Sequence, residues 1–311
     1  MKVLVTGAAG FIGSHLCRRL IAEDHGVVGL DDLSDGSRDN IADLSSLRLI
    51  EADLRDETAV LQATAGIDVI FHQGAKRSVP RSIEFPAETT DVNVRGTLNV
   101  LSAARERGAR VVFASSSSVY GDQERFPLSE TFEPRPQSPY AASKVAGEIY
   151  CQSWWRTFGT PTICLRYFNV FGPGQDPLNE YAVVVPRFIH ACLTGQAPVI
   201  HGDGQQARDF TYIDDVVEAN LLATGAGEEA WGRVMNIGGG RTPTSVNRLL
   251  EIVATATGSR REPVHEPPRS GDVRFTQADI SLARSLIGYV PKVGIEEGVR
   301  RTAEWFRKSG I

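Results

Sequence analysis

The stretch Lys2–Gly13 reads K-V-L-V-T-G-A-A-G-F-I-G. Its first residues form a short apolar run, and from Phe11 to Ala22 apolar residues recur with the period of a helix. Between them, Gly7 permits a tight turn, Gly10 lets backbone approach a pyrophosphate, and Gly13 lets helix and strand pack closely. The N-terminus of the helix then faces the phosphates. The stretch therefore predicts a strand, a phosphate-binding turn and a helix.

A carboxylate follows at the place where a dinucleotide site needs one. The apolar run V-V-G-L ends at Asp31, eighteen residues beyond Gly13. This context matters because the glycine spacing, G-x-x-G-x-x-G, departs from the general fingerprint G-x-G-x-x-G. Asp31 can accept hydrogen bonds from both hydroxyls of an adenosine ribose, and it repels a 2′-phosphate. Asp32 strengthens that repulsion, whereas Arg38 acts against it. We therefore predict NAD rather than NADP.

The rest of the chain alternates between strand and helix patterns. Further apolar runs that predict strands lie at residues 47–50, 68–71, 111–114 and 161–166. Such alternation predicts an α/β fold of the Rossmann-like kind, with a doubly wound parallel sheet. We expect an NAD-binding domain at 1–168 and, at 169–311, mainly a smaller α/β substrate-binding lobe. Segments near 205–236 are expected to pack back on the first domain.

Two polar residues beside these elements are candidates for nucleotide contacts. Asp53 follows the third strand in E-A-D-L-R-D, where it either caps a helix or holds the adenine amine. Asn93 falls on the buried face of a long helix expected at about 87–107. A buried amide is unusual there unless it bonds backbone or cofactor.

A second decisive stretch carries groups that transfer protons. Residues 111–121 read V-V-F-A-S-S-S-S-V-Y-G, and a helix starts with S-P-Y-A-A-S-K at Ser138. Tyr140 and Lys144 lie one turn apart on it. A free phenol ionises near pH ~10, but a nearby ammonium favours the phenolate, so we expect Tyr140 to take a proton near neutral pH. Ser115–Ser118 leave the strand at its carboxyl end and offer a hydroxyl to the same substrate oxygen.

Composition narrows the classes of partner. The net charge of the 311 residues is −5, with lysine and arginine scattered, which favours neither a nucleic-acid nor an anionic-membrane surface. No uncharged apolar run approaches the ~20 residues needed to span a bilayer. The cysteines show neither C-x-x-C pairing nor a histidine at metal-ligand spacing, which predicts reduced thiols, no metal and a cytoplasmic location. They are Cys17, Cys151, Cys164 and Cys192.

The motifs T-G-A-A-G-F-I-G, S-S-S-S-V-Y-G and S-P-Y-A-A-S-K, in this order, resemble the extended short-chain dehydrogenase/reductases, and specifically their nucleotide-sugar 4-epimerases. The resemblance covers nearly the whole chain. It implies that Ser116, Tyr140 and Lys144 form the catalytic set, with Ser118 as the alternative hydroxyl. Tyr140 would remove the proton of the sugar 4-hydroxyl while the C4 hydride moves to NAD. The resulting 4-keto sugar would rotate and take the hydride back on its other face, leaving a tightly held NAD unchanged.

The resemblance also completes the expected NAD site. The full set is Gly7, Gly10, Phe11, Ile12, Gly13, Asp31, Asp32, Asp53, Leu54, Gln73, Asn93, Tyr140 and Lys144.

For the substrate, the resemblance places the diphosphate on Arg208 and Arg269, whose guanidinium groups can bond oxygens bidentately. Tyr167 and His201 lie where relatives hold uracil. Thr276 stands where relatives restricted to UDP-glucose and UDP-galactose carry a bulky tyrosine. The small side chain leaves room for a 2-acetamido group. The expected substrate set is Arg77, Ser78, Ser116, Ser117, Ser118, Tyr167, Asn169, His201, Arg208, Arg269, Asp272 and Thr276.

The resemblance favours a UDP-hexose 4-epimerase acting on UDP-Glc/UDP-Gal and also on UDP-GlcNAc/UDP-GalNAc. The alternative is a 4,6- or 5,6-dehydratase, but those relatives carry an acid directly after the catalytic hydroxyl residue, and Ser117 and Ser118 stand here. A UDP-glucuronate 4-epimerase is disfavoured because such relatives usually have threonine at the position of Asn169. A non-catalytic NAD-binding scaffold need not keep the proton-transfer set.

The family resemblance also predicts a homodimer. Relatives commonly pair through two long helices, expected here at about 87–107 and 139–158. Trp154 and Trp155 would lie near that surface.

Overall fold

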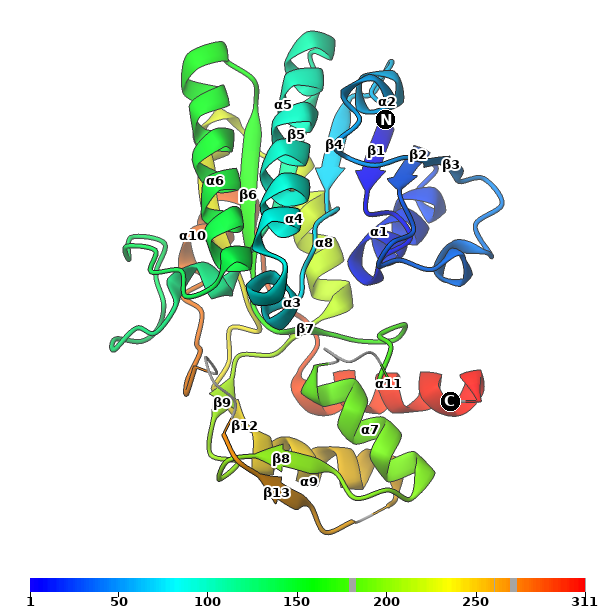
Figure 1. The fold of residues 1–311 in the computed structure, drawn as a ribbon, viewed down its shortest axis with the longest axis vertical. Helices are drawn as coiled ribbons and strands as arrows, with labels where there is room; N and C mark the ends of the chain where they lie inside the picture. The colour runs from blue at the N-terminus through cyan, green and yellow to red at the C-terminus, as the bar shows by residue number, and fades with distance from the viewer. Residues whose placement is uncertain (179–182, 260, 269–272, 311) are drawn as a thin grey trace.

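The computed structural model describes residues 1–178, 183–259, 261–268 and 273–310. A central sheet has the strand order β11-β6-β5-β4-β1-β2-β3, with every neighbouring pair parallel. The direction of winding reverses between β1 and β4, so the predicted Rossmann-like, doubly wound sheet is confirmed (Figure 1). Its strands are β1 (Lys2–Thr6), β2 (Gly26–Asp31), β3 (Arg48–Glu51), β4 (Val69–His72), β5 (Arg110–Ser116), β6 (Thr162–Tyr167) and β11 (Arg233–Ile237).

Helices cover both faces of the sheet, and β1 shows why. Because successive side chains of a strand point to opposite faces, Val3 and Val5 join one core while Leu4 joins the other. The first core includes side chains of α1 (Phe11–Ala22) and α8 (Ile213–Thr224). The second core lies under α2 (Glu57–Ala63), α5 (Gly96–Arg107) and α6 (Pro139–Phe158).

A smaller part of the molecule lies beyond the carboxyl edge of the sheet, at the bottom of Figure 1. Its three helices pack on one another: α7 (Val184–Thr194), α9 (Val246–Thr257) and α11 (Ile295–Ser309). Three short strand pairs lie outside the central sheet in the described residues: β7 (Val170–Phe171) with β10 (Thr211–Tyr212), β8 (Val199–His201) with β13 (Val264–Glu266), and β9 (Ala207–Arg208) with β12 (Thr244–Ser245). Within the 205–236 region, α8 packs against α1 and β11 extends the sheet beyond β6.

The helix expected at about 87–107 is interrupted. It consists of α4 (Pro86–Thr90), a one-turn π-helix at Asp91–Arg95 (η2) and then α5. Asn93 lies in the π-turn, where its amide bonds the backbone of Lys76. Such single π-turns often occur at functional sites. The remaining helical elements are η1 (Arg38–Ile41), α3 (Val79–Glu84), η3 (Ser117–Tyr120), η4 (Glu228–Ala230) and α10 (Ser281–Ile287).

The cysteines are not linked by disulfide bonds. All four cysteines are buried and carry free thiols. In the part of the chain that the structure describes, none of the helices has the length and apolar character needed to cross a membrane.

Candidate active site

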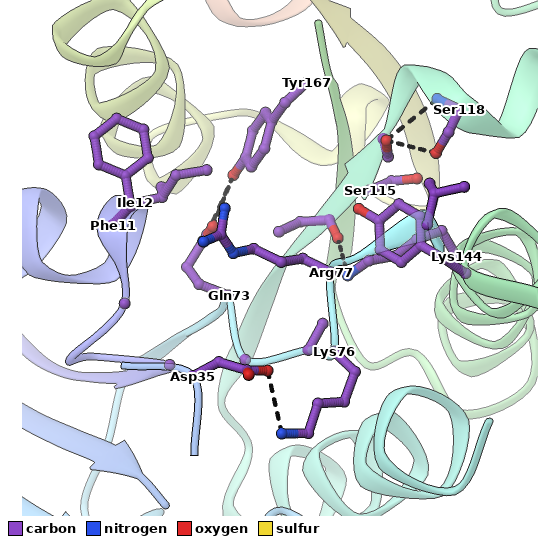
Figure 2. A pocket seen from close by; sticks show the side chains of 18 of the residues that line it. Phe11, Ile12, Asp35, Gln73, Lys76, Arg77, Ser115, Ser118, Lys144 and Tyr167 are labelled. Atoms are coloured by element: carbon purple, nitrogen blue, oxygen red, sulfur yellow. Dashed lines mark hydrogen bonds and ion pairs between the residues drawn. The ribbon is translucent and has the colours of Figure 1, made fainter. Parts of the chain in front are cut away.

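A cavity of about 650 Å³ runs along the carboxyl edge of the sheet. Its walls come from the loops after β1, β2, β3, β4, β5 and β6 and from the start of α6, together with β9 and residues 273 and 276. This size is typical of small-molecule sites, and the carboxyl edge at a reversal of winding is where open α/β sheets bind ligands. Figure 2 shows side chains from several of these loops converging on the same space.

The glycine turn after β1 forms one end of the cavity. Gly7 has a φ of +67°, and a Cβ there would lie 2.8 Å from Gly74 of the β4 loop. A Cβ on Gly13 would overlap the carbonyl oxygen of Gly7. The first backbone amides of α1 therefore lie against the cavity floor. The first amides of a helix have no hydrogen-bond acceptor within the helix, so they can bind an anion. This cradle fits the pyrophosphate of a dinucleotide.

Asp31 completes the fit at the end of β2. Its carboxylate accepts hydrogen bonds from the amides of Ala9, at 2.9 Å, and Leu33, at 2.8 Å. A carboxylate has about four acceptor positions, so capacity remains for ribose hydroxyls. Burial raises the pKa of Asp31, while those two amides act in the opposite direction. Asp32 also lines the cavity and accepts a hydrogen bond from the Ser34 amide at 3.0 Å.

Sequence reasoning missed a buried lysine in the part of the cavity that contains Asp31 and Asp32. The Lys76 ammonium lies 3.1 Å from Asp35 and 2.8 Å from the hydroxyl of Ser34, and all three residues line the cavity. No motif singles out Lys76. The only signal for its position was Asn93, the polar residue in an otherwise apolar helix face.

Asn93 itself corrects a prediction, because it is not among the residues that line the cavity. Its side chain accepts from the Lys76 amide at 2.7 Å and donates to the Lys76 carbonyl and to Ser143, at 3.0 and 2.9 Å. The amide therefore bonds backbone, which is the first of the two alternatives, and it holds the loop that carries Lys76.

Asp53 lines the cavity but caps no helix. The N-cap of α2 is Asp56, whose side chain accepts from the Ala59 amide at 3.0 Å. The Asp53 carboxylate instead pairs with Arg55 at 2.6 Å, and this hydrogen bond lowers its pKa. Its cavity position leaves the contact with adenine as a prediction.

The proton-transfer groups meet at the centre of the cavity. Ser138 caps α6 by accepting from the Ala141 amide. The cap fixes where the helix starts, and so fixes the face on which Tyr140 and Lys144 lie. Ser116 lowers the pKa of the Tyr140 phenol, which indicates that its hydroxyl lies near the phenol oxygen. Ser118 donates to the Ser116 hydroxyl at 2.7 Å, and both serines line the cavity with Tyr140, so Ser116 stays the predicted catalytic hydroxyl and Ser118 the alternative.

The electrostatics of this centre differ from the expectation. Burial raises the pKa of Tyr140, and the opposing effects come from the hydrogen bond with Ser116 and the charge of Arg77. Burial also lowers the pKa of Lys144 to about 8. Its ammonium donates to the Ala114 carbonyl at 2.8 Å and lies 5.9 Å from the centre of the Tyr140 ring. The prediction that Lys144 makes Tyr140 ionise near neutral pH is therefore wrong, because the pKa of Tyr140 is raised and Lys144 is not among the groups that lower it.

Three distant segments build the other end of the cavity. Asn169, which has a φ of +35°, donates to the Asp209 carbonyl and to the Thr276 hydroxyl, both at 3.1 Å. Thr276 also accepts from the Asp209 amide at 3.2 Å. Arg208 lines the cavity beside them. These contacts place an amide, a small hydroxyl residue and a guanidinium group around one space.

Several predicted substrate contacts lie elsewhere. Ser78 is not among the lining residues, since it caps α3 by accepting from the Arg81 amide at 3.2 Å. His201 lies on β8, outside the lining, with its Nδ1 3.5 Å from Glu266. Tyr167 lines the cavity, but its hydroxyl bonds Gln73 and Asn220, so it is not brought together with His201. Arg269 and Asp272 lie outside the described residues.

The other predicted residues do line the cavity. In the nucleotide half they are Gly7, Gly10, Phe11, Ile12, Gly13, Asp31, Asp32, Asp53, Leu54 and Gln73. In the centre and the substrate half they are Arg77, Ser116, Ser117, Ser118, Tyr140, Lys144, Tyr167, Asn169, Arg208 and Thr276.

Comparisons with known proteins agree with this geometry. Residues 3–238 match the model of the NAD dependent epimerase/dehydratase family. A UDP-glucose 4-epimerase of Mycolicibacterium smegmatis is 42% identical over 99% of both chains. The crystal structure of UDP-glucose 4-epimerase from Thermotoga maritima with UDP-glucose has a TM-score of 0.95 at 39% identity, covering 100% of both chains. UDP-N-acetylglucosamine 4-epimerase from Methanobrevibacter ruminantium, solved with UDP-N-acetylmuramic acid, has a TM-score of 0.94 at 37% identity, over 99% of this chain and 98% of that one.

Proposed function

Because the chain belongs to the NAD dependent epimerase/dehydratase family, we propose that it is an NAD-dependent UDP-hexose 4-epimerase, an isomerase that interconverts UDP-glucose and UDP-galactose. The observation that carries the proposal is that Ser116, Tyr140 and Lys144 line the same cavity as the glycine turn. Relatives that are UDP-glucose 4-epimerases over their full length support the same reaction.

NAD, when bound, supplies the acceptor for the hydride of the sugar C4 and later the donor that returns it. The chain's own groups handle the proton. Tyr140 removes it from the 4-hydroxyl and gives it back to the 4-keto oxygen, and Ser116 holds the same oxygen by a hydrogen bond. Arg77 adds positive charge near the phenol, which favours its ionised form. Gly7–Gly13, Asp31 and Lys76 would hold the dinucleotide.

Two features select the substrate. Arg208 offers a guanidinium group to the diphosphate of the UDP-sugar, and Asn169 lies beside it. Thr276 leaves space for a 2-acetamido group, so UDP-GlcNAc and UDP-GalNAc are also substrates. The similarity to a UDP-N-acetylglucosamine 4-epimerase supports this extension.

The position of the acidic residues argues for isomerisation rather than elimination of water. Elimination needs an acid and a base near the sugar. The carboxylates among the described lining residues all follow β2 and β3, in the nucleotide half, and Ser117 and Ser118 stand beside the catalytic serine. They are Asp31, Asp32, Asp35 and Asp53.

The remaining proposals concern organisation. Residues 1–168 would form the NAD-binding domain and 169–311 mainly the substrate lobe. A cytoplasmic homodimer would pair through α5 and α6, where Ile149 is 59% exposed and Phe158 is 41% exposed with Arg105 stacked on its ring. Trp154 packs edge-on against Phe158 on this surface, whereas Trp155 contacts Trp231.

The test is chromatographic analysis of UDP-glucose incubated with the purified protein, compared between wild type and Tyr140→Phe. We expect wild type to form UDP-galactose, and Tyr140→Phe to lower kcat by about 10²–10⁴-fold because the proton acceptor is lost. Tyr150→Phe is the matched control, since Tyr150 lies on the same helix but packs against Trp154. Product formation by Tyr140→Phe at the rate of Tyr150→Phe would refute the mechanism.

A further inference from the structure

A fully buried ion pair lies next to the proton-transfer groups but outside the residues that line the cavity. The side chains of Glu148 and Arg166 are only 3% and 4% exposed. Arg166 donates to both carboxylate oxygens of Glu148, at 2.8 and 2.7 Å, in a bidentate pair. The Ser115 hydroxyl donates to the same carboxylate at 2.5 Å.

Stability alone is a weak reason for such a pair. Removing two charges from water is costly, and replacing a buried ion pair by apolar side chains of similar volume is often neutral or stabilising. What an ion pair offers beyond apolar packing is direction, because a bidentate pair fixes the relative orientation of the groups it joins. Glu148 and Arg166 orient groups on two sides, on α6 and at the ends of β5 and β6.

One side of the contact is α6. Tyr140, Lys144 and Glu148 follow at four-residue intervals along α6, and so share one helical face. They contact three consecutive residues at the end of β5. Tyr140 lies near enough to Ser116 for that side chain to lower its pKa, Lys144 bonds the carbonyl of Ala114, and Glu148 bonds the hydroxyl of Ser115 between them.

The other side is the paired ends of β5 and β6. Ser115 and Arg166 are direct partners in the register of β5 and β6, so Glu148 clamps two paired strand ends to α6. The guanidinium carbon of Arg166 also lies 4.6 Å from the centre of the Tyr120 ring, which ends the turn carrying Ser117 and Ser118. The Tyr120 hydroxyl in turn donates to Asn236 at 2.7 Å.

From this geometry we propose that Glu148, paired with Arg166, is a positioning residue for the epimerase reaction: by holding Ser115 it fixes the Ser116 hydroxyl and the Lys144 ammonium relative to Tyr140. The inference rests on the proposed function for the reaction that is affected. The contacts of Glu148 and Arg166 do not depend on that function. A displacement of about 1 Å at such a centre can cost roughly 100-fold in rate.

The decisive variant replaces both charges together, Glu148→Met with Arg166→Met, so that no unpaired charge is left buried. We expect kcat to fall roughly 10–100-fold, the KM for UDP-glucose to change less than about threefold because the lining residues remain, and the melting temperature to stay near that of wild type. Thr162→Val is the matched control. Thr162 donates to the Cys151 carbonyl at 2.7 Å in the same interface of α6 and β6, farther from the catalytic end.

Thr162→Val is expected to lower the melting temperature with kcat unchanged. A folded double variant with wild-type kcat would overturn the proposal, as would equal losses of kcat in the double variant and in Thr162→Val. If the double variant fails to fold, Ser115→Ala decides, since it leaves the ion pair intact and removes its link to β5. We expect a several-fold lower kcat, and an unchanged kcat would overturn the proposal.

A second readout separates this inference from the proposed function. The Tyr140 phenol can be titrated by ultraviolet difference spectroscopy against Tyr140→Phe, without any turnover. Ser116 lowers the pKa of the Tyr140 phenol, so the double variant, in which Ser116 is no longer held in place, should titrate at higher pH than wild type. A wild type without epimerase activity but with this shift would refute only the proposed reaction. An unchanged titration together with normal kcat would refute only the positioning role.

Discussion

The two halves of the cavity are built in different ways. In the nucleotide half, one contiguous turn between β1 and α1 supplies the floor. Backbone atoms form this surface, since a Cβ on Gly13 would overlap the Gly7 carbonyl. In the substrate half, side chains of Asn169, Arg208 and Thr276 come from three segments that are far apart in sequence. A local turn leaves no room for substitution, whereas an assembled wall can change one side chain at a time.

The sharpest way to break this comparison is Gly13→Ala. Overpacking of a close backbone contact costs about 1–3 kcal/mol, so we expect NAD affinity to fall roughly 10–100-fold and epimerisation to fall with it. The measurement is the NAD content per chain after gel filtration, together with turnover of UDP-glucose. Gly26→Ala is the control, because a Cβ on Gly26 meets its nearest atom, Lys2 Cγ, at an ordinary 3.6 Å. Equal NAD retention by the two variants would contradict a backbone-shaped site.

The same contrast explains what the sequence could predict. The β1 strand, the glycine turn and Asp31 were predictable because neighbouring residues alone specify them. The doubly wound parallel sheet was also predictable from the alternation of strands and helices, although β11 joins the sheet from far along the chain. Lys76 was not predictable, because its place in the cavity depends on Asn93, a residue of the π-turn seventeen positions away that bonds the Lys76 backbone.

The substrate half shows the limit of assignment by resemblance. Thr276 and Asn169 do meet in the cavity, but Ser78 caps α3 and His201 lies outside the lining. A motif position indicates which loop a residue belongs to, not which way its side chain points. The charge environment of Tyr140 was missed for a similar reason, because burial depends on the whole fold.

A narrower effect, limited to one pair of substrates, is expected from Thr276→Tyr. The added ring fills space near Asn169 without touching the nucleotide half, so turnover of UDP-GlcNAc should fall roughly 10–100-fold relative to UDP-glucose, with NAD content unchanged. Parallel assays of both substrates provide the measurement. Because Thr276 also bonds Asn169 and Asp209, Thr276→Val separates bulk from hydrogen bonding and should retain the substrate ratio. A variant that loses both substrates equally would show that the wall cannot change independently.

The smallest effect concerns acid, to which the two halves should respond with opposite sign. Behind the nucleotide half, at the end of β4, buried His72 bonds Thr6 and Thr97, and burial lowers its pKa from 6.5 to about 3. The folded state therefore binds fewer protons than the unfolded state, so the stabilising contribution of His72 is present above pH 6.5 and is lost as the pH falls toward 3. In the substrate half, burial raises the pKa of Asp209 from 3.8 to about 6, so its contribution is present below pH 3.8 and is lost as the pH rises through 6.

Between pH 6.5 and 5.5 the neutral His72 should cost the fold up to about 1.4 kcal/mol. Urea unfolding at these two pH values, for wild type and for His72→Gln, measures that term, since the variant has no imidazole to titrate. Hydrogen exchange then locates it: amides of β1 and β4 should lose protection on acidification, while those near Asp209, which accepts from the Gly239 and Ala278 amides, should not. Equal loss of protection in both halves would mean that the cavity responds to acid as one unit, with no difference between its turn and its wall.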